Sequence, residues 1–258
     1  MYTRDMKLIL AAIENNLDDF YEKCSYHPNF NSQISNKINW VQSKYVDWPN
    51  CIFKVNFEEL NIVAEINQVK ALIKERTAPN GWTVGPLTKP SNLGNMLENF
   101  NFSNVYHQAG MALDLKNLKY NNLESIKLEI ITVNNEKMLK QWNIIVSSVF
   151  KIKIDLGLLN YLLSEEKSRF YLGFYNGKPV STLLLYLSSG VAGLHAVSTL
   201  PEYRNKGFGL TISGVALKDS YKMGYKIGVL QASELGENVY RNLGFKKYCD
   251  IFSYELQE

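Results

Sequence analysis

The sequence predicts a mixed α/β (α+β) fold in which a mostly antiparallel central sheet is flanked by helices. The first observation is a hairpin: apolar runs at 170–175 and 178–187 flank Asn176-Gly177, a dipeptide that favours a tight turn between strands. The second is a strand, a loop and a helix that follow one another over residues 194–223. The third is the alternation of extended and helical patterns along the second half of the chain.

The first half opens on a helix over residues 3–23, where apolar residues recur at helical spacing. His27-Pro28-Asn29 ends or redirects it. Residues 30–50 are polar and aromatic without a clear period, which predicts a loop holding at most one short helix. The patterns that follow predict strands and helices in the order strand 51–57, helix 60–75, strand 82–85, helix 93–99 and strand 105–115.

The second half has a clearer order. Polar residues 117–122 predict a linker, which divides the chain into domains 1–120 and 121–258. After it, and around the hairpin and the strand-loop-helix unit, the patterns predict strand 126–133, helix 136–150, helix 156–163, strand 226–231, helix 237–242 and a last strand over 246–256.

Composition excludes several classes of function. The chain has 258 residues, 46% of them apolar, and its net charge of +3 is too small to predict a nucleic-acid partner. Cys24, Cys51 and Cys249 are scattered without disulfide or metal-ligand spacing, so we expect reduced thiols and no metal. The sequence shows no export cleavage site and no apolar run of membrane-spanning length, which predicts a cytoplasmic protein without a membrane partner.

Residues 194–210 carry the main chemical signal. Pro201 lacks an N–H and ends the strand, and Gly207 and Gly209 let backbone amides approach a ligand closely. The helix that follows presents unpaired amides and the positive end of its dipole, while Arg204 and Lys206 add positive charge. This pattern favours an anion, and a pyrophosphate fits it best.

The stretch Arg204-Asn205-Lys206-Gly207-Phe208-Gly209 resembles the Arg/Gln-x-x-Gly-x-Gly/Ala signature of the GNAT superfamily of N-acetyltransferases. Residues 230–245 resemble the other signature of that superfamily, a strand and a tyrosine-bearing helix that closes on Leu243-Gly244-Phe245. The two matches together are specific. They imply a GNAT-like fold and acetyl-coenzyme A (acetyl-CoA) as co-substrate.

The resemblance also implies which residues hold the donor. Strand residues Val197, Ser198 and Thr199 match the positions whose backbone binds pantetheine. The loop and first helical turn match the pyrophosphate site, which comprises Arg204, Asn205, Lys206, Gly207, Phe208, Gly209 and Leu210. Ser233 matches a position near the cofactor, and helix capping is its alternative role.

Tyr240 is the candidate general acid, because a phenol stays protonated at neutral pH and can protonate the departing thiolate. Packing in the core is the alternative for this side chain. The base is open: the position matching the carboxylate base of some relatives is Gly193, and His195 lies two residues along. We expect His195, Val197 and Thr199 on one face of the strand. A base-free route through water, and Glu234 or Glu237 as acceptor-side groups, stay open.

An internal comparison suggests a second copy of the fold. Residues 95–102 align with residues 238–245, each after a strand and a helix start, and Leu97 falls at the position of Tyr240. Residues 51–77 hold no glycine, so a phosphate loop is missing there. The hypothesis is a degenerate GNAT-like or accessory N-terminal domain, and chance similarity is the alternative.

The sequence therefore predicts transfer of an acetyl group to the primary amine of a small molecule or amino acid, directly within a ternary complex, by a monomer or homodimer. A non-catalytic GNAT-fold protein that binds acyl-CoA or a partner is the alternative. A dinucleotide site is excluded because the third glycine of Gly-x-Gly-x-x-Gly is replaced by Ile212. Use of an aminoacyl-tRNA donor is disfavoured because relatives with that donor lack the pyrophosphate signature.

Overall fold

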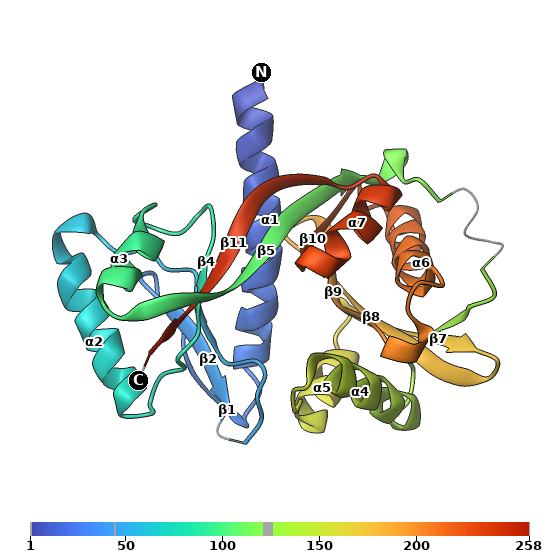
Figure 1. Ribbon diagram of the computed structural model, residues 1–258, viewed down its shortest axis with the longest axis horizontal. Helices are drawn as coiled ribbons and strands as arrows, with labels where there is room; N and C mark the ends of the chain where they lie inside the picture. The colour runs from blue at the N-terminus through green and yellow to red at the C-terminus, as the bar shows by residue number, and fades with distance from the viewer. Residues whose placement is uncertain (1, 44, 121–125, 258) are drawn as a thin grey trace.

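The computed structural model describes residues 2–43, 45–120 and 126–257 (Figure 1). The helices are α1 (Tyr2–Ser25), α2 (Ile62–Lys74), α3 (Leu93–Asn99), α4 (Glu136–Phe150), α5 (Leu156–Leu163), α6 (Phe208–Lys222) and α7 (Glu234–Leu243). The strands are β1 (Phe30–Gln33), β2 (Asn39–Ser43), β3 (Cys51–Phe53), β4 (Trp82–Val84), β5 (Phe102–Asp114), β6 (Glu129–Thr132), β7 (Ser168–Tyr175), β8 (Lys178–Ser188), β9 (Val191–Thr199), β10 (Ile227–Ala232) and β11 (Lys246–Leu256). Within these ranges, no helix has both the length and the apolarity to span a bilayer.

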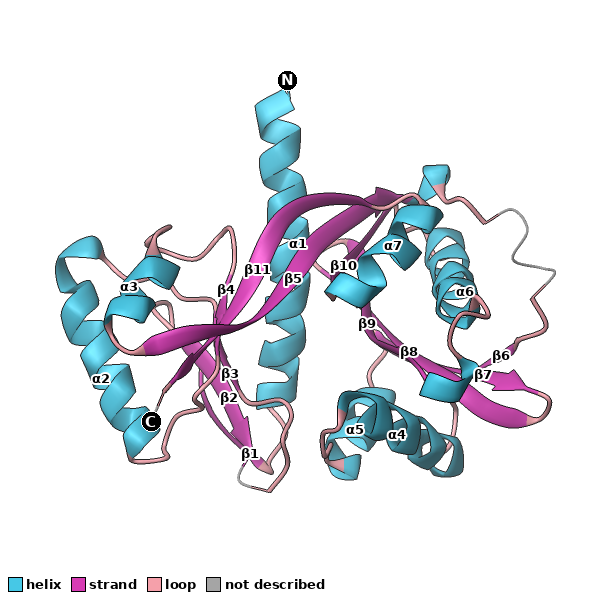
Figure 2. Cartoon of the chain, in the orientation of Figure 1, coloured by secondary structure: helices cyan, strands magenta, loops and turns pink. Residues whose placement is uncertain are grey.

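The strands form one eleven-stranded sheet in the order β1-β2-β3-β4-β11-β5-β10-β9-β8-β7-β6. Its pairs are antiparallel except for β3 with β4 and β9 with β10. Helices cover both faces (Figure 2). The predicted fold class, a mostly antiparallel sheet flanked by helices, is confirmed.

The arrangement of strands is nearly symmetric about the two central strands, β11 and β5. Each half contributes three successive antiparallel strands and a fourth that lies parallel to the third, β1 to β4 in one half and β7 to β10 in the other. The two central strands are exchanged: β5 follows α3 but pairs with β10, while β11 follows α7 but pairs with β4. β5 and β11 also pair with each other, so the long ribbon in the middle of Figure 1 joins both halves.

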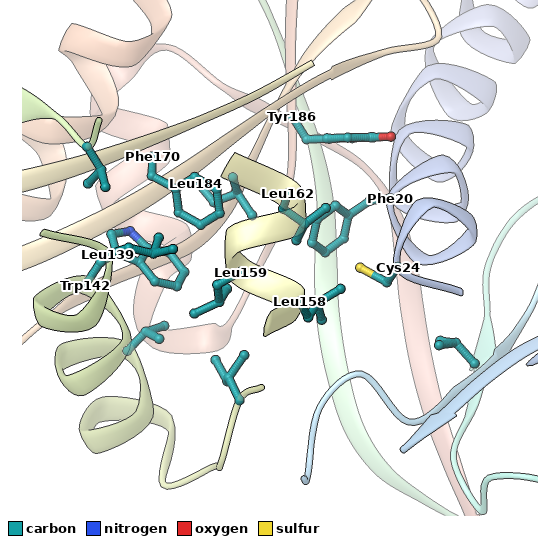
Figure 3. Close-up of a cluster of buried hydrophobic side chains, with 14 of the residues drawn as sticks. Phe20, Cys24, Leu139, Trp142, Leu158, Leu159, Leu162, Phe170, Leu184 and Tyr186 are labelled. Carbon is teal, nitrogen blue, oxygen red and sulfur yellow. The ribbon is translucent and has the colours of Figure 1, made fainter. Parts of the chain in front are cut away.

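The helices form two layers. Ile13 and Leu17 of α1 pack against Ala112 on one face of β5, whereas the neighbouring Met111 packs with Ile212 of α6 on the other face. α4 and α5 pack on the same face of the sheet as α1, and their apolar side chains contribute to the buried cluster in Figure 3. There the ring of Phe20 lies 5.2 Å from that of Tyr186. The first helix of the chain is therefore anchored on the strands of its second half.

One predicted segment has a different secondary structure in the fold. Residues 30–50 contain β1 and β2, not a loop with a short helix. β2 lies between β1 and β3, and its residues Asn39, Trp40 and Val41 are all buried, so the strand lacks the polar and apolar alternation that would reveal it. The hairpin at Asn176-Gly177 is confirmed, with positive φ at both residues. Part of the predicted linker lies outside the described residues.

Candidate functional site

The basic, glycine-bearing loop lies between β9 and α6, as predicted. β9 ends at Thr199, a single 3-10 turn spans Pro201–Tyr203, and α6 begins at Phe208. Asn205 and Gly207 have φ values of 61° and 77°, a region that glycine enters without a Cβ penalty. The backbone thus turns sharply into the helix.

The start of α6 can hold an anion. The first bond across this turn runs from the Thr211 amide to the Gly207 carbonyl, 2.9 Å, so the amides of Phe208, Gly209 and Leu210 have no partner within the helix. The helix dipole adds partial positive charge at the same point. A Cβ on Gly209 would meet only the Thr199 hydroxyl, at 3.9 Å, so the approach is open.

Two cations flank this helix start, and both are exposed. Nε of Arg204 donates to the Thr199 carbonyl oxygen at 3.3 Å, which ties the loop to the end of β9. Nζ of Lys206 lies 5.3 Å from the centre of the Tyr175 ring. The positive charge predicted for the loop is therefore present at its surface.

β9 and β10 part above this loop. They pair in parallel only where residues 192–194 face residues 228–230, and the described strands share no further pair beyond Leu194. β10 continues along β5, and β9 continues along β8. The last part of β9, from His195 to Thr199, therefore has no strand partner on the side of β10, and we call this separation of the two strands the opening.

A bulge in β9 corrects one prediction. Thr182 pairs with Ser198 but Leu184 pairs with His195, so two residues of β9 face one residue of β8. Ala196 takes a positive φ of 48° within this bulge. Expecting His195, Val197 and Thr199 on one face was therefore wrong: His195 shares its face with Ser198, and Val197 lies with the side chains of the α6 face. A bulge inserts one residue and breaks the alternation of period two.

Tyr240 lies in α7 among the side chains of the α6 face, and 8% of its surface is exposed. Burial raises the pKa of its phenol above the ordinary value. Its hydroxyl forms no hydrogen bond with the described residues. Ser233 caps the same helix, since its hydroxyl accepts from the Gly236 amide at 3.3 Å. The capping role foreseen for Ser233 is thus present.

His195 lies on the opposite face, against α1. Its Nε2 lies 2.9 Å from Oδ1 of Asn16, and its ring stacks on Phe20 with centroids 4.7 Å apart. Packing of these groups lowers the pKa of His195 to about 4 by desolvation. At neutral pH the imidazole is therefore uncharged.

The comparisons with known proteins agree with this geometry. Residues 135–245 match the family model described as acetyltransferase (GNAT) family. This part of the chain is therefore similar to a GNAT acetyltransferase domain. A comparison of the sequence with curated proteins gives no match.

Solved structures extend the likeness to the whole chain. A GCN5-related N-acetyltransferase from Kribbella flavida has a TM-score of 0.72 at 12% identity, covering 94% of this chain and 95% of that one. One from Sphaerobacter thermophilus has a TM-score of 0.63 at 14% identity, covering 98% and 91%. A protein of unknown function from Staphylococcus epidermidis has a TM-score of 0.60 at 9% identity, covering 90% and 96%. The N-terminal half is thus also GNAT-like in fold.

The structure adds a residue that the sequence analysis missed. Asn16 of α1 reaches β8 and β9 and occupies the space beside Gly193, where a Cβ would overlap its Oδ1. A signal was present in the sequence: Asn16 is polar on the helix stripe that also carries Ile13, Leu17 and Phe20. A polar residue on an apolar stripe indicates a buried hydrogen-bonding role.

The arrangement separates the two candidate catalytic residues. Tyr240 lies on the α6 face of the sheet and His195 on the α1 face, with β9 and its opening between them. Among the residues that the structure describes, no group of His, Cys, Asp and Glu side chains could hold a metal ion. The candidate site comprises a basic loop, an unpaired strand edge, a phenol and an imidazole.

Proposed function

We propose that the protein is an acetyl-CoA-dependent N-acetyltransferase that moves an acetyl group to the primary amine of a small molecule or amino acid, directly in a ternary complex. The observation that supports this most is the opening between β9 and β10, next to a helix start with unpaired amides. The open approach at Gly209 and the intact Tyr240 add to it.

In this proposal the pyrophosphate binds the loop and first turn formed by Arg204, Asn205, Lys206, Gly207, Phe208, Gly209 and Leu210. The amides of that turn donate to the phosphate oxygens, and the helix dipole favours their charge. Pantetheine lies along the unpaired edge of β9 at Val197, Ser198 and Thr199. Ser233 contributes to this site by capping the helix that carries Tyr240.

The reaction then joins the amine nitrogen to the carbonyl carbon of the thioester and breaks the carbon–sulfur bond. The thiolate takes a proton from the Tyr240 phenol, which burial keeps protonated. The amine passes its proton to His195, directly or through a water. Because burial makes His195 a weak base, it hands this proton on to solvent, and solvent returns a proton to the Tyr240 phenolate.

We further propose that residues 1–120 form a degenerate copy of the GNAT fold and residues 121–258 the working copy. The near-palindromic strand order and the correspondence of α3 and β5 with α7 and β11 support it. The free state of Cys24, Cys51 and Cys249 fits a cytoplasmic protein, acting as a monomer or homodimer.

The test is incubation of the protein with acetyl-CoA and a panel of amines: monoamines, diamines, amino sugars and amino acids. Thiol release is monitored together with the mass of each amine. Acetylated product from at least one amine, with no acetylated protein, supports direct transfer. Saturable acetyl-CoA binding with no product from any amine would favour the alternative, a non-catalytic protein that binds acyl-CoA or a partner.

A further inference from the structure

Asn16 is a buried polar residue that lies between the two halves of the chain. It lies on α1, it is fully buried, and its side-chain partners all belong to β8 and β9. A buried amide must find partners for its donors and acceptor, so its contacts define how it is oriented. These contacts determine which atom of the Asn16 amide faces His195.

The orientation of the Asn16 amide is set by a backbone carbonyl. Nδ2 lies 3.1 Å from the Tyr186 carbonyl oxygen and 2.9 Å from Oγ of Ser188. A carbonyl oxygen only accepts, so the atom facing Tyr186 must be the amide nitrogen. Oδ1 is therefore the atom that faces His195, and it can only accept.

The hydrogen bond to His195 then selects one form of the imidazole. Because Oδ1 accepts, Nε2 of His195 must carry the hydrogen in the 2.9 Å contact. In a neutral ring this leaves Nδ1 as the nitrogen with a lone pair. His195 keeps some accessible surface, and the bulge at Ala196 places its ring on the α1 face.

We propose that Asn16 is a positioning residue for acetyl transfer: it holds His195 in the Nε2–H form, so that Nδ1 takes the proton that leaves the amine. This inference rests on the proposed function. When Nδ1 takes the proton, the ring gains a positive charge and Nε2 keeps its bond to Oδ1. Gly193 belongs to the same arrangement, because a larger residue there would displace the Asn16 amide.

Few other groups around the His195 ring could fix which of its nitrogens carries the hydrogen. Phe20 of α1 and Tyr186 of β8 contribute aromatic rings at 4.7 Å and 6.4 Å. The titratable side chains on these elements include the Tyr186 phenol of β8 and the carboxyls of Glu14, Asp18 and Asp19 of α1. None of these is a cause of the lowered pKa of His195, which comes from burial. Asn16 is thus the polar partner of Nε2.

The test is a long-range proton–nitrogen NMR correlation of the histidine-labelled protein, in which the His195 signals are assigned with His195→Gln. The wild type should show the Nε2–H form. Asn16→Leu, similar in volume, should convert His195 to a mixture of forms, whereas the matched control Asn15→Leu should not. Asn16→Asp keeps the acceptor, so it should keep the Nε2–H form and raise the pKa of His195 by about 1 to 3.

The activity readout separates this inference from the proposed function. With an amine that passes the panel, Asn16→Leu should lower kcat by roughly 10- to 100-fold with little change in KM for acetyl-CoA. An Nδ1–H form in the wild type, or unchanged kcat and an unchanged imidazole in Asn16→Leu, would overturn the role of Asn16. Failure of every amine would instead overturn the proposed function, and the NMR result on Asn16 would still stand.

Discussion

The two halves of the molecule contain corresponding elements, but their parallel strand pairs, β3 with β4 and β9 with β10, differ in what lies beyond the paired residues. In the second half, β9 and β10 part after Leu194 and leave an opening. In the first half, the segment after β4 closes the equivalent space: the Lys89 amide donates to the Val55 carbonyl at 2.9 Å, and the Phe57 amide donates to the Lys89 carbonyl at 3.0 Å. A backbone that satisfies itself in this way leaves no edge for a ligand to join.

The loops that lead into α6 and α2 also differ, in their glycine content. The loop before α6 turns through Gly207 at positive φ, whereas residues 54–61 before α2 contain no glycine. The fold alone is therefore compatible with either an open or a closed pair. An anion site requires the glycine-bearing turn and the open edge in addition.

The closed half still contributes to the open one. α1 packs Phe20 against Tyr186 and His195 and places Asn16 beside Gly193. On its other side, α1 places Glu14 against the closing segment, where the Leu87 amide donates to the carboxylate at 2.6 Å. One helix thus connects the closed pair to the open one.

The largest effect is expected from Gly209→Asp. The aspartate would set a carboxylate against the pyrophosphate at the start of α6, so we expect acetyl-CoA binding to weaken at least ~100-fold. Folding should be retained, because negative charge at a helix start is favourable. Calorimetry measures the affinity, and Gly209→Ala is the matched control, since its Cβ meets only the Thr199 hydroxyl at 3.9 Å. Equal affinity in the aspartate variant would place the donor elsewhere.

Tyr240→Phe tests the chemistry of the open half. Removing a general acid should lower kcat about 100-fold while the affinity for acetyl-CoA stays within about twofold, because the phenol acts on the leaving thiolate. Steady-state kinetics with an accepted amine measure both. Leu97, which aligns with Tyr240, is buried in the first half, so a conservative Leu97→Met change serves as control and should leave kcat unaffected. An unchanged kcat in Tyr240→Phe would remove the phenol from the mechanism.

Glu14→Gln probes the closed half through the pH dependence of stability. Burial raises the pKa of Glu14 from its ordinary value of 4.5 to about 7, against the opposing bonds from Leu87 and Thr88. The folded state binds this proton more tightly, so its stabilisation is present at low pH and is lost as pH rises from 4.5 to about 7. The linked free energy is at most about 3 kcal/mol.

The glutamine variant should therefore lose less stability between pH 5 and pH 8 than the wild type in urea titrations. The slope is reduced rather than abolished, because burial also raises the pKa of Asp18, one turn along α1. Glu166→Gln, at an exposed position, should leave the slope unchanged. Identical slopes in Glu14→Gln and the wild type would contradict the burial of this carboxyl.

The contact between the halves at Gly193 has the smallest expected effect. Gly193→Ala places a Cβ against Oδ1 of Asn16 and 2.8 Å from Nε2 of His195, so the free energy of unfolding should fall by about 1–3 kcal/mol. Asn16→Ala removes the overlap with Oδ1 but leaves the contact with His195, so the double variant should be more stable than the sum of the two single changes predicts. Chemical denaturation of the four proteins measures this coupling, and strict additivity would show that the contact is absent.

The sequence predicted the fold and the basic loop because both are local. Asn176-Gly177 specifies a turn on its own, and Pro201 with Gly207 and Gly209 specifies the strand end and the helix start. β1 and β2 were not predicted because their burial depends on β3 and α1, which come from elsewhere in the chain. The face of His195 depends on a bulge that no residue type marks, and its partner Asn16 lies 179 positions away.

The central claim is that only the open pair in the second half binds the donor. Calorimetric titration of the wild-type protein with acetyl-CoA, with adenosine diphosphate as a control, tests it most directly. We expect saturable binding with one site per chain, lost in Gly209→Asp. Two sites per chain would show that the first half is also competent, and no saturable binding would contradict the donor site.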